Sequence, residues 1–148
     1  MDLVQLLETE GDAIVAEATD SLSRLRHYAA SGTEENRQRI SRLFALTLDC
    51  VRTKNLLPML DHAHQVTRER HRDGFDLQEV HAAFNVLEEI IWQRITARLA
   101  PQDYPEAFGL ASTVLGAGKQ ALAVEYVTLA SQRGTVESLD LRALFQGT

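Results

Sequence analysis

Histidine is the residue type in this sequence with the clearest capacity for metal chemistry, and the spacing of its five copies argues against a shared site. They are His27, His62, His64, His71 and His81. On a helix, His62 and His64 point about 200° apart, and His64 and His71 lie two turns, or roughly 10 Å, apart. No His-x-x-x-His pair occurs. We therefore predict that the chain holds no metal ion.

Haem ligation needs only one well-placed imidazole, so histidine spacing leaves it open. The candidate ligands for this alternative are His64 and His71, which come just before a glycine at position 74. Our preferred expectation is a protein without a cofactor, and the alternative is a haem-binding sensor of the globin type.

Other catalytic patterns are incomplete. The stretch Gly116-Ala117-Gly118-Lys119 resembles the end of a phosphate loop, but Thr113 replaces the first glycine and Gln120 replaces the Ser or Thr. Two glycines inside a helix more often allow close helix approach. No serine or cysteine beside a base on a sharp turn indicates a nucleophile. We predict that the protein is not an enzyme; the alternative is a helical-bundle enzyme whose site assembles from distant acids and histidines.

Composition indicates one globular domain. The chain has 148 residues, of which 45% are hydrophobic and 24% charged, and its net charge is −6. An acidic chain with interspersed basic residues is poorly suited to nucleic acid or an anionic membrane. No apolar run approaches the ~20 residues of a membrane span, and no secretion signal begins the chain. We expect a cytoplasmic protein whose single cysteine, Cys50, is a small buried residue.

Apolar residues recur at intervals of three, four and seven, which predicts an all-α domain of five helices. The domain spans residues 1–134, and residues 135–148 form a tail or linker with the pattern of a short helix. The helices are expected over 2–28, from a Thr33 cap to about 54, from an Asn55 cap to the glycine at 74, from 76 to about 100, and over 106–132.

The junction at Gly74 carries a compact set of helix-end signals. Gly74 suits the left-handed position after a helix, and Asp76 with Glu79 has the spacing of a capping box. Phe75 and Val80 flank the box as a hydrophobic staple. We predict that this junction stabilises the fold and is not a binding site.

The last two helices are apolar on more than one face, although a surface helix needs only one apolar stripe. The second face either belongs to a central helix of the same chain or contacts a partner. In the second case a homodimer would form through the fourth and fifth helices. The candidate interface residues are Ile90, Trp92, Val114, Ala117 and Ala121.

The segment from Arg70 to Leu87 resembles the N-terminal domain of RsbR-type (RsbRD) co-antagonists, which are stressosome and related bacterial signalling proteins. The similarity rests on an arginine-containing helix end, the run Gly74-Phe75-Asp76-Leu77, Glu79 and an apolar helix after it. The helix order and a long helix containing Tyr126 extend it to about residues 3–132.

This resemblance implies a globin-like fold without haem, dimerisation, and transfer of a signal to a following output domain, commonly a STAS domain, or to a partner protein. The chain ends at Thr148, too early for such a domain. The expectation is therefore a non-enzymatic stress-signalling sensor, either excised or free-standing, that binds a partner or a small apolar ligand.

Overall fold

A computed structural model describes residues 1–132 of the chain. Its helices are α1 (Leu3–Ser23), α2 (Arg26–Ala29), α3 (Thr33–Thr53), α4 (Leu57–Arg72), α5 (Leu77–Arg98) and α6 (Tyr104–Gln132), with a 3₁₀ turn, η1, at Pro101–Asp103. Five of these helices are long, and no strand occurs over residues 1–132. The all-α, five-helix prediction is confirmed. The predicted tail at 135–148 lies outside the described residues.

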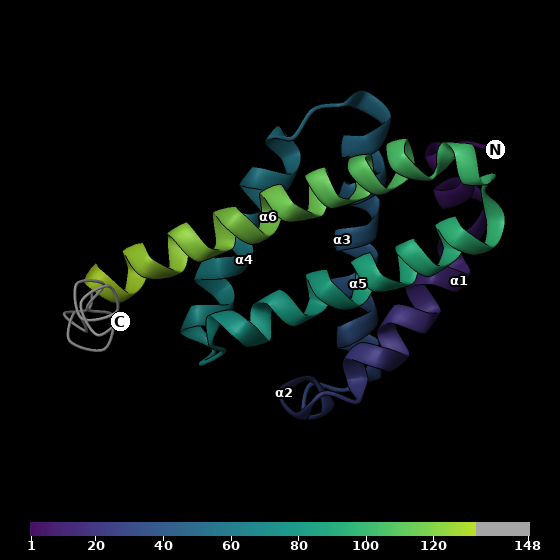
Figure 1. Cartoon of the computed structure of the whole chain (residues 1–148). Helices are drawn as coiled ribbons and strands as arrows, with labels where there is room; N and C mark the ends of the chain where they lie inside the picture. The colour runs from purple at the N-terminus through teal and green to yellow at the C-terminus, as the bar shows by residue number, and fades with distance from the viewer. Residues whose placement is uncertain (133–148) are drawn as a thin grey trace, which may run out of the picture.

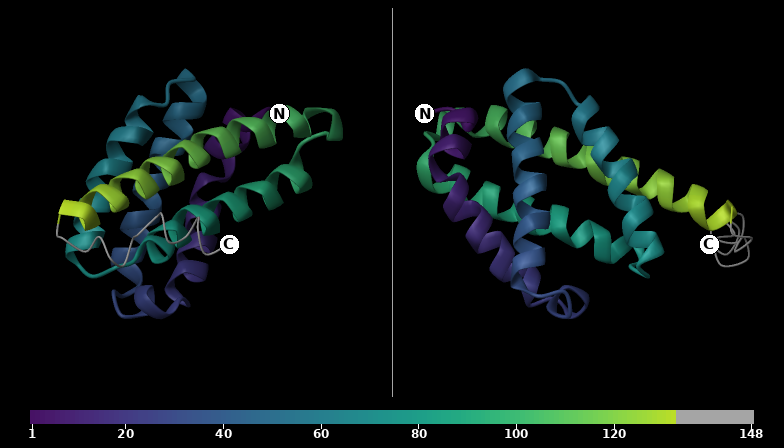
Figure 2. Two further views of the ribbon diagram at one scale, coloured as in Figure 1. Left: turned by 60° about the vertical axis from the view of Figure 1, so that its left-hand side comes forward. Right: turned by 180° about the vertical axis from the view of Figure 1, so that it is seen from behind.

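The helices form two layers. The antiparallel helices α5 and α6 make one layer, and α1, α3 and α4 cross behind it (Figures 1 and 2). Helix α6 packs on α4 and α5, and α1 packs on α3 and α5. Side chains between the layers make one apolar core, whose largest fully buried members are Tyr28, Leu6, Leu7, Ile14, Leu22, Ile40, Leu43, Met59, Leu87, Ile91, Ile95 and Leu115.

Several of the predicted helix boundaries are wrong. The cap position of α4 is Leu56 and not Asn55, although the Leu57 amide donates to Asn55 Oδ1 at 3.1 Å, and α6 begins at Tyr104 and not at 106. The first helix ends at Ser23 instead of Tyr28, because Leu25 is extended (ψ 142°) and a separate turn, α2, follows. This break carries Tyr28 into the core, where its hydroxyl donates to the Glu79 carbonyl at 2.9 Å. Thr33 is the first residue of α3 and not its cap; Gly32 occupies the cap position at φ 88°, and no side chain caps the helix.

The glycines of the incomplete phosphate-loop pattern lie within α6, and no strand precedes this helix in the described part of the chain. A Cβ on Gly118 would come within 2.6 Å of Phe84 Cε2 and 3.0 Å of Met59 Sδ, whereas a Cβ on Gly116 would meet nothing within 4 Å. Gly118 therefore permits close packing of α6 on α4 and α5, and Gly116 does not serve that purpose.

Candidate functional site

The junction between α4 and α5 has the geometry that its sequence predicts. Asp76 Oδ1 accepts from the Glu79 amide and Glu79 Oε1 accepts from the Asp76 amide, both at 2.8 Å. Gly74 is left-handed at φ 87°. The Phe75 amide donates to the Arg70 carbonyl at 2.9 Å, which completes a Schellman motif at the end of α4. This geometry fixes the direction in which Phe75 leaves the helix.

Four side chains surround the Phe75 ring, namely His27, Tyr28, Arg39 and Arg70. We call these four residues and Phe75 the Phe75 cluster. The Tyr28 and His27 rings lie 5.3 and 5.9 Å from the Phe75 ring between centroids. The Arg39 and Arg70 guanidinium carbons lie 5.7 and 5.9 Å from its centroid. Cations at this distance from an aromatic face are attracted by the ring. The cluster joins α2, α3 and α4 at the start of α5.

Helix α6 is attached to the same junction through Tyr126. The Tyr126 hydroxyl donates to the Phe75 carbonyl, and the His71 ring packs edge-on against Tyr126 at 5.4 Å. Burial, with a contribution from the Asp76 charge, raises the pKa of Tyr126 to about 12. The phenol is therefore protonated at neutral pH and remains a donor to the junction.

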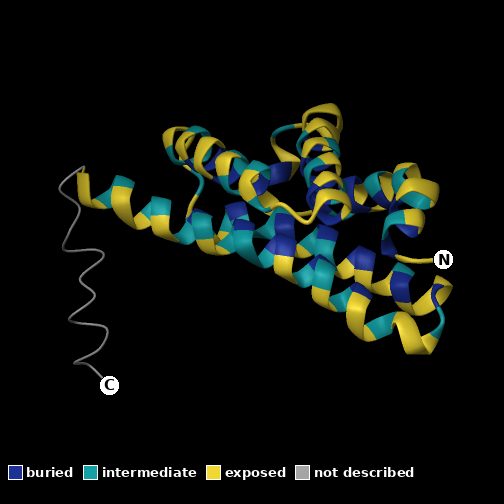
Figure 3. Ribbon diagram, turned by 90° about the horizontal axis from the view of Figure 1, so that it is seen from above, coloured by how far each residue is buried: buried dark blue, intermediate teal, exposed yellow. Residues whose placement is uncertain are grey.

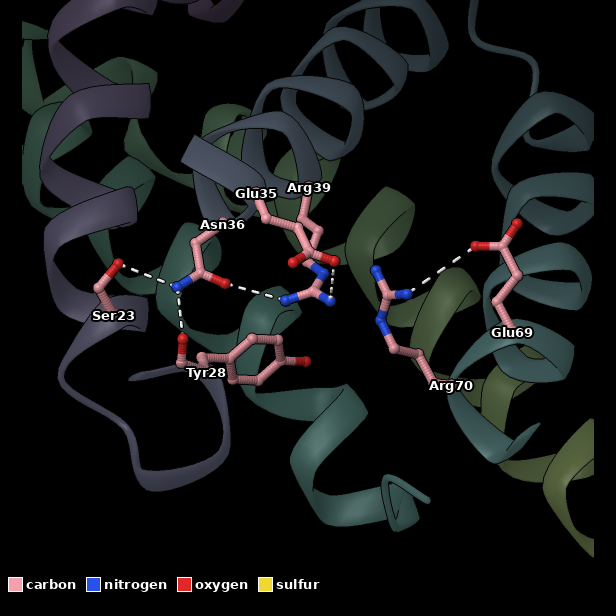
Figure 4. Close-up of polar contacts among 7 residues, drawn as sticks. All are labelled: Ser23, Tyr28, Glu35, Asn36, Arg39, Glu69 and Arg70. Carbon is pink, nitrogen blue, oxygen red and sulfur yellow. Dashed lines mark hydrogen bonds and ion pairs between the residues drawn. The ribbon is translucent and has the colours of Figure 1, made fainter. Parts of the chain in front are cut away.

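A second polar network fixes the position of Arg39 (Figure 4). The buried amide of Asn36 donates to the Tyr28 carbonyl at 2.7 Å and to Ser23 Oγ at 3.1 Å. Arg39 donates to Asn36 Oδ1 and to Glu35 Oε1, each at 2.9 Å. The Arg39 side chain is only 11% exposed, although the helix periodicity places it off the apolar face.

Arg39 and Arg70 line a cleft of about 170 Å³ between α3 and α4. Figure 4 shows their guanidinium groups facing each other from the two helices. Arg42 and His62 also line it, and three residues of α5, Val80, Ala83 and Phe84, contribute an apolar part.

Two basic groups in the cleft have a lowered pKa, because they are partly buried next to other positive charges. Burial, followed by the Arg70 charge, lowers the pKa of Arg39. Burial, with Arg42 and Arg70, lowers the pKa of His62 to about 4, so this imidazole is neutral at pH 7. The local field therefore opposes additional positive charge.

The two histidines considered for haem have other neighbours. His64 is exposed, and its Nδ1 lies 3.2 Å from Glu125 Oε2 of α6. His71 packs on Tyr126. Over residues 1–132, no three His, Cys, Asp or Glu side chains are grouped closely enough to hold a metal ion.

The candidate interface residues divide into two groups. Ile90 and Val114 are buried in the chain's own core, at 5% and 3% exposure. Trp92 is 43% exposed, and Ala117 and Ala121 are partly exposed. The Trp92 ring packs edge-on against Phe108 of α6 at 5.7 Å. Only Trp92 and the two alanines are therefore accessible to a partner.

Comparisons with known proteins give one family. The model of the RsbT co-antagonist protein rsbRD N-terminal domain matches residues 9–137. No curated protein matches the chain, and no solved structure does. None of the helices in the described part of the chain is long and apolar enough to cross a membrane.

Proposed function

The chain belongs to the family of RsbT co-antagonist N-terminal domains, which regulate stress signalling, and from this premise we propose that it is a non-catalytic sensor domain acting as a homodimer. Its task is to convert a binding event into a change at the α5–α6 layer. A following domain or a separate partner protein would receive that change from α6.

The lack of outward-facing charge on α6 over residues 107–132 is the observation that carries the dimer proposal. Between residues 107 and 132 the sequence has two charged residues, Lys119 and Glu125. Lys119 pairs with Glu88 of α5 at 3.1 Å, and Glu125 pairs with residues of α4. Both charges are thus directed at neighbouring helices of the same chain, and the outer face is left without any.

Two apolar side chains of α6 are exposed, Val124 at 59% and Val127 at 37%, among exposed uncharged polar residues such as Gln120 and Thr128. Trp92 of α5 is also exposed, at 43%, where it packs against Phe108 of α6. In the described part of the chain no helix covers the outer side of the α5–α6 layer (Figures 2 and 3). Exposed apolar side chains on a helix layer that nothing covers favour contact with a partner. A two-fold contact would bring this face against its copy, so that α5 and α6 of both chains form a four-helix bundle.

Light scattering tests the dimer. At tens of micromolar we expect twice the chain mass of 16.5 kDa. Val124→Glu should shift the protein toward monomer, because an unpaired carboxylate is costly to bury in an interface. The matched control is Leu57→Glu, which places the same charge on an exposed leucine of α4. Wild-type protein of monomer mass would refute the dimer, and dimeric Val124→Glu protein would refute this choice of face.

A further inference from the structure

The cleft between α3 and α4 has the character of an anion site, and we propose that it binds a small oxyanion, a carboxylate or a phosphate, between Arg39 and Arg70. This inference deepens the proposed function, on which it rests, by naming the chemical class of the ligand that the sensor recognises.

The first argument is an excess of positive charge. Three arginines and two glutamates line the cleft: Arg39, Arg42, Arg70, Glu35 and Glu69. Glu35 accepts from Arg39 at 2.9 Å and so compensates that arginine, although Glu35 is itself 56% exposed to solvent. Arg70 is compensated less well, because Glu69 Oε2 lies 3.8 Å from Arg70 Nη1, beyond hydrogen-bond distance.

The second argument is the donor capacity of Arg70. Its side chain is only 13% exposed, and among residues 1–132 Glu69 is the only acidic residue within 4.0 Å of its guanidinium, which also interacts with the Tyr28 hydroxyl. A guanidinium has five N–H donors in a planar fork that matches the oxygens of carboxylate or phosphate. Two arginines shielded from water in this way would bind an oxyanion more strongly than exposed arginines would.

Size and lining restrict the ligand further. A cleft of about 170 Å³ is large enough for a phosphate ion or a short carboxylate. Val80, Ala83 and Phe84 offer a short apolar surface to a carbon chain. The charged walls suit this ligand better than the small apolar ligand that we expected from the sequence.

The site is connected to the α5–α6 layer through the Phe75 cluster. Both arginines contact the Phe75 ring, and the Phe75 carbonyl accepts the hydroxyl of Tyr126 in α6. An anion that draws Arg39 and Arg70 toward each other changes their packing on Phe75. That change would reach α6 through one aromatic ring and one hydrogen bond.

The site is tested by isothermal titration calorimetry of the full chain at constant ionic strength. Inorganic phosphate is titrated in one experiment and succinate in another. We expect saturable binding of at least one ion, and the tighter of the two identifies the source of the oxyanion. Arg70→Gln should weaken that binding at least about tenfold, the range for a lost charge-assisted hydrogen bond. The matched control, Arg68→Gln, alters a 71%-exposed arginine of α4 that does not line the cleft and should leave the affinity within about twofold.

Binding of neither ion at 10 mM would overturn the proposal, as would equal weakening by both substitutions. If circular dichroism shows that Arg70→Gln loses helix, Arg70→Lys replaces it, because lysine keeps the charge but lacks the planar fork: weaker binding supports the site, and unchanged affinity overturns it. Light scattering on the same samples separates the two proposals. A dimer without anion binding refutes only the site, and a monomer that binds the ion refutes only the dimer.

Discussion

At the scale of single residues, the α3–α4 cleft gathers basic groups, several of which are partly shielded from solvent. A partly buried imidazole beside two guanidinium groups cannot readily take a proton, which is the physical cause of the low pKa of His62. In the unfolded chain the same imidazole titrates near its ordinary pKa of about 6.5. The difference couples proton uptake to unfolding.

We predict that His62 makes the protein less stable in mild acid. Above about pH 6.5 the imidazole is neutral in both states; as the pH falls toward 4, the unfolded state gains a proton that the folded state excludes. The resulting loss in the free energy of unfolding is on the order of 2 to 3 kcal/mol by pH 4. Urea unfolding at a series of pH values should show a flatter dependence for His62→Gln than for wild type.

His64→Gln is the control for this experiment, because the His64 imidazole is exposed on the same helix. All three proteins share the titration of their carboxylates, so only the difference between the curves is diagnostic. Parallel curves for wild type and His62→Gln would show that this imidazole is not shielded from water.

At the scale of helices, the close packing of α6 against α4 and α5 depends on Gly118 and not on the nearby Gly116. Gly118→Ala should destabilise the protein by about 1–3 kcal/mol, because the added methyl would overlap Phe84 and Met59. Gly116→Ala meets no atom within 4 Å and should stabilise α6 by roughly 0.5–1 kcal/mol through helix propensity. Thermal unfolding of the two variants measures both effects. Equal shifts in the same direction would contradict this assignment.

Helix number, helix type and the α4–α5 junction were predictable from sequence, because periodicity and capping are local properties. The break after Ser23 was not, since it depends on where Tyr28 finds a partner 51 residues away, at Glu79. The Phe75 cluster was missed for the same reason. Its arginines come from α3 and α4, and the helix pattern placed Arg39 on the outer surface of the protein.

At the scale of the whole molecule, the contact between the two layers contains ion pairs, whereas the outer face of α6 lacks them. Ion pairs lie across the layers where α1 meets α5: Arg94 Nη1 lies 2.6 Å from Glu10 Oε1, and Nη2 lies 2.8 Å from Glu17 Oε2. The outer face of α6 has no comparable charge between residues 107 and 132. If a second copy covers that face, folding and association become linked.

This linkage predicts a thermal midpoint that depends on protein concentration. Only the folded dimer benefits from association, so a tenfold increase in concentration should raise the midpoint by about 2–3 °C for a chain of this size. Val124→Glu should remove the dependence, and Leu57→Glu should retain it, since only the first places charge on the proposed interface. Calorimetry from 5 to 500 µM measures the effect directly. A wild-type midpoint that stays constant across this range would indicate that the α5–α6 layer is stable without a partner copy.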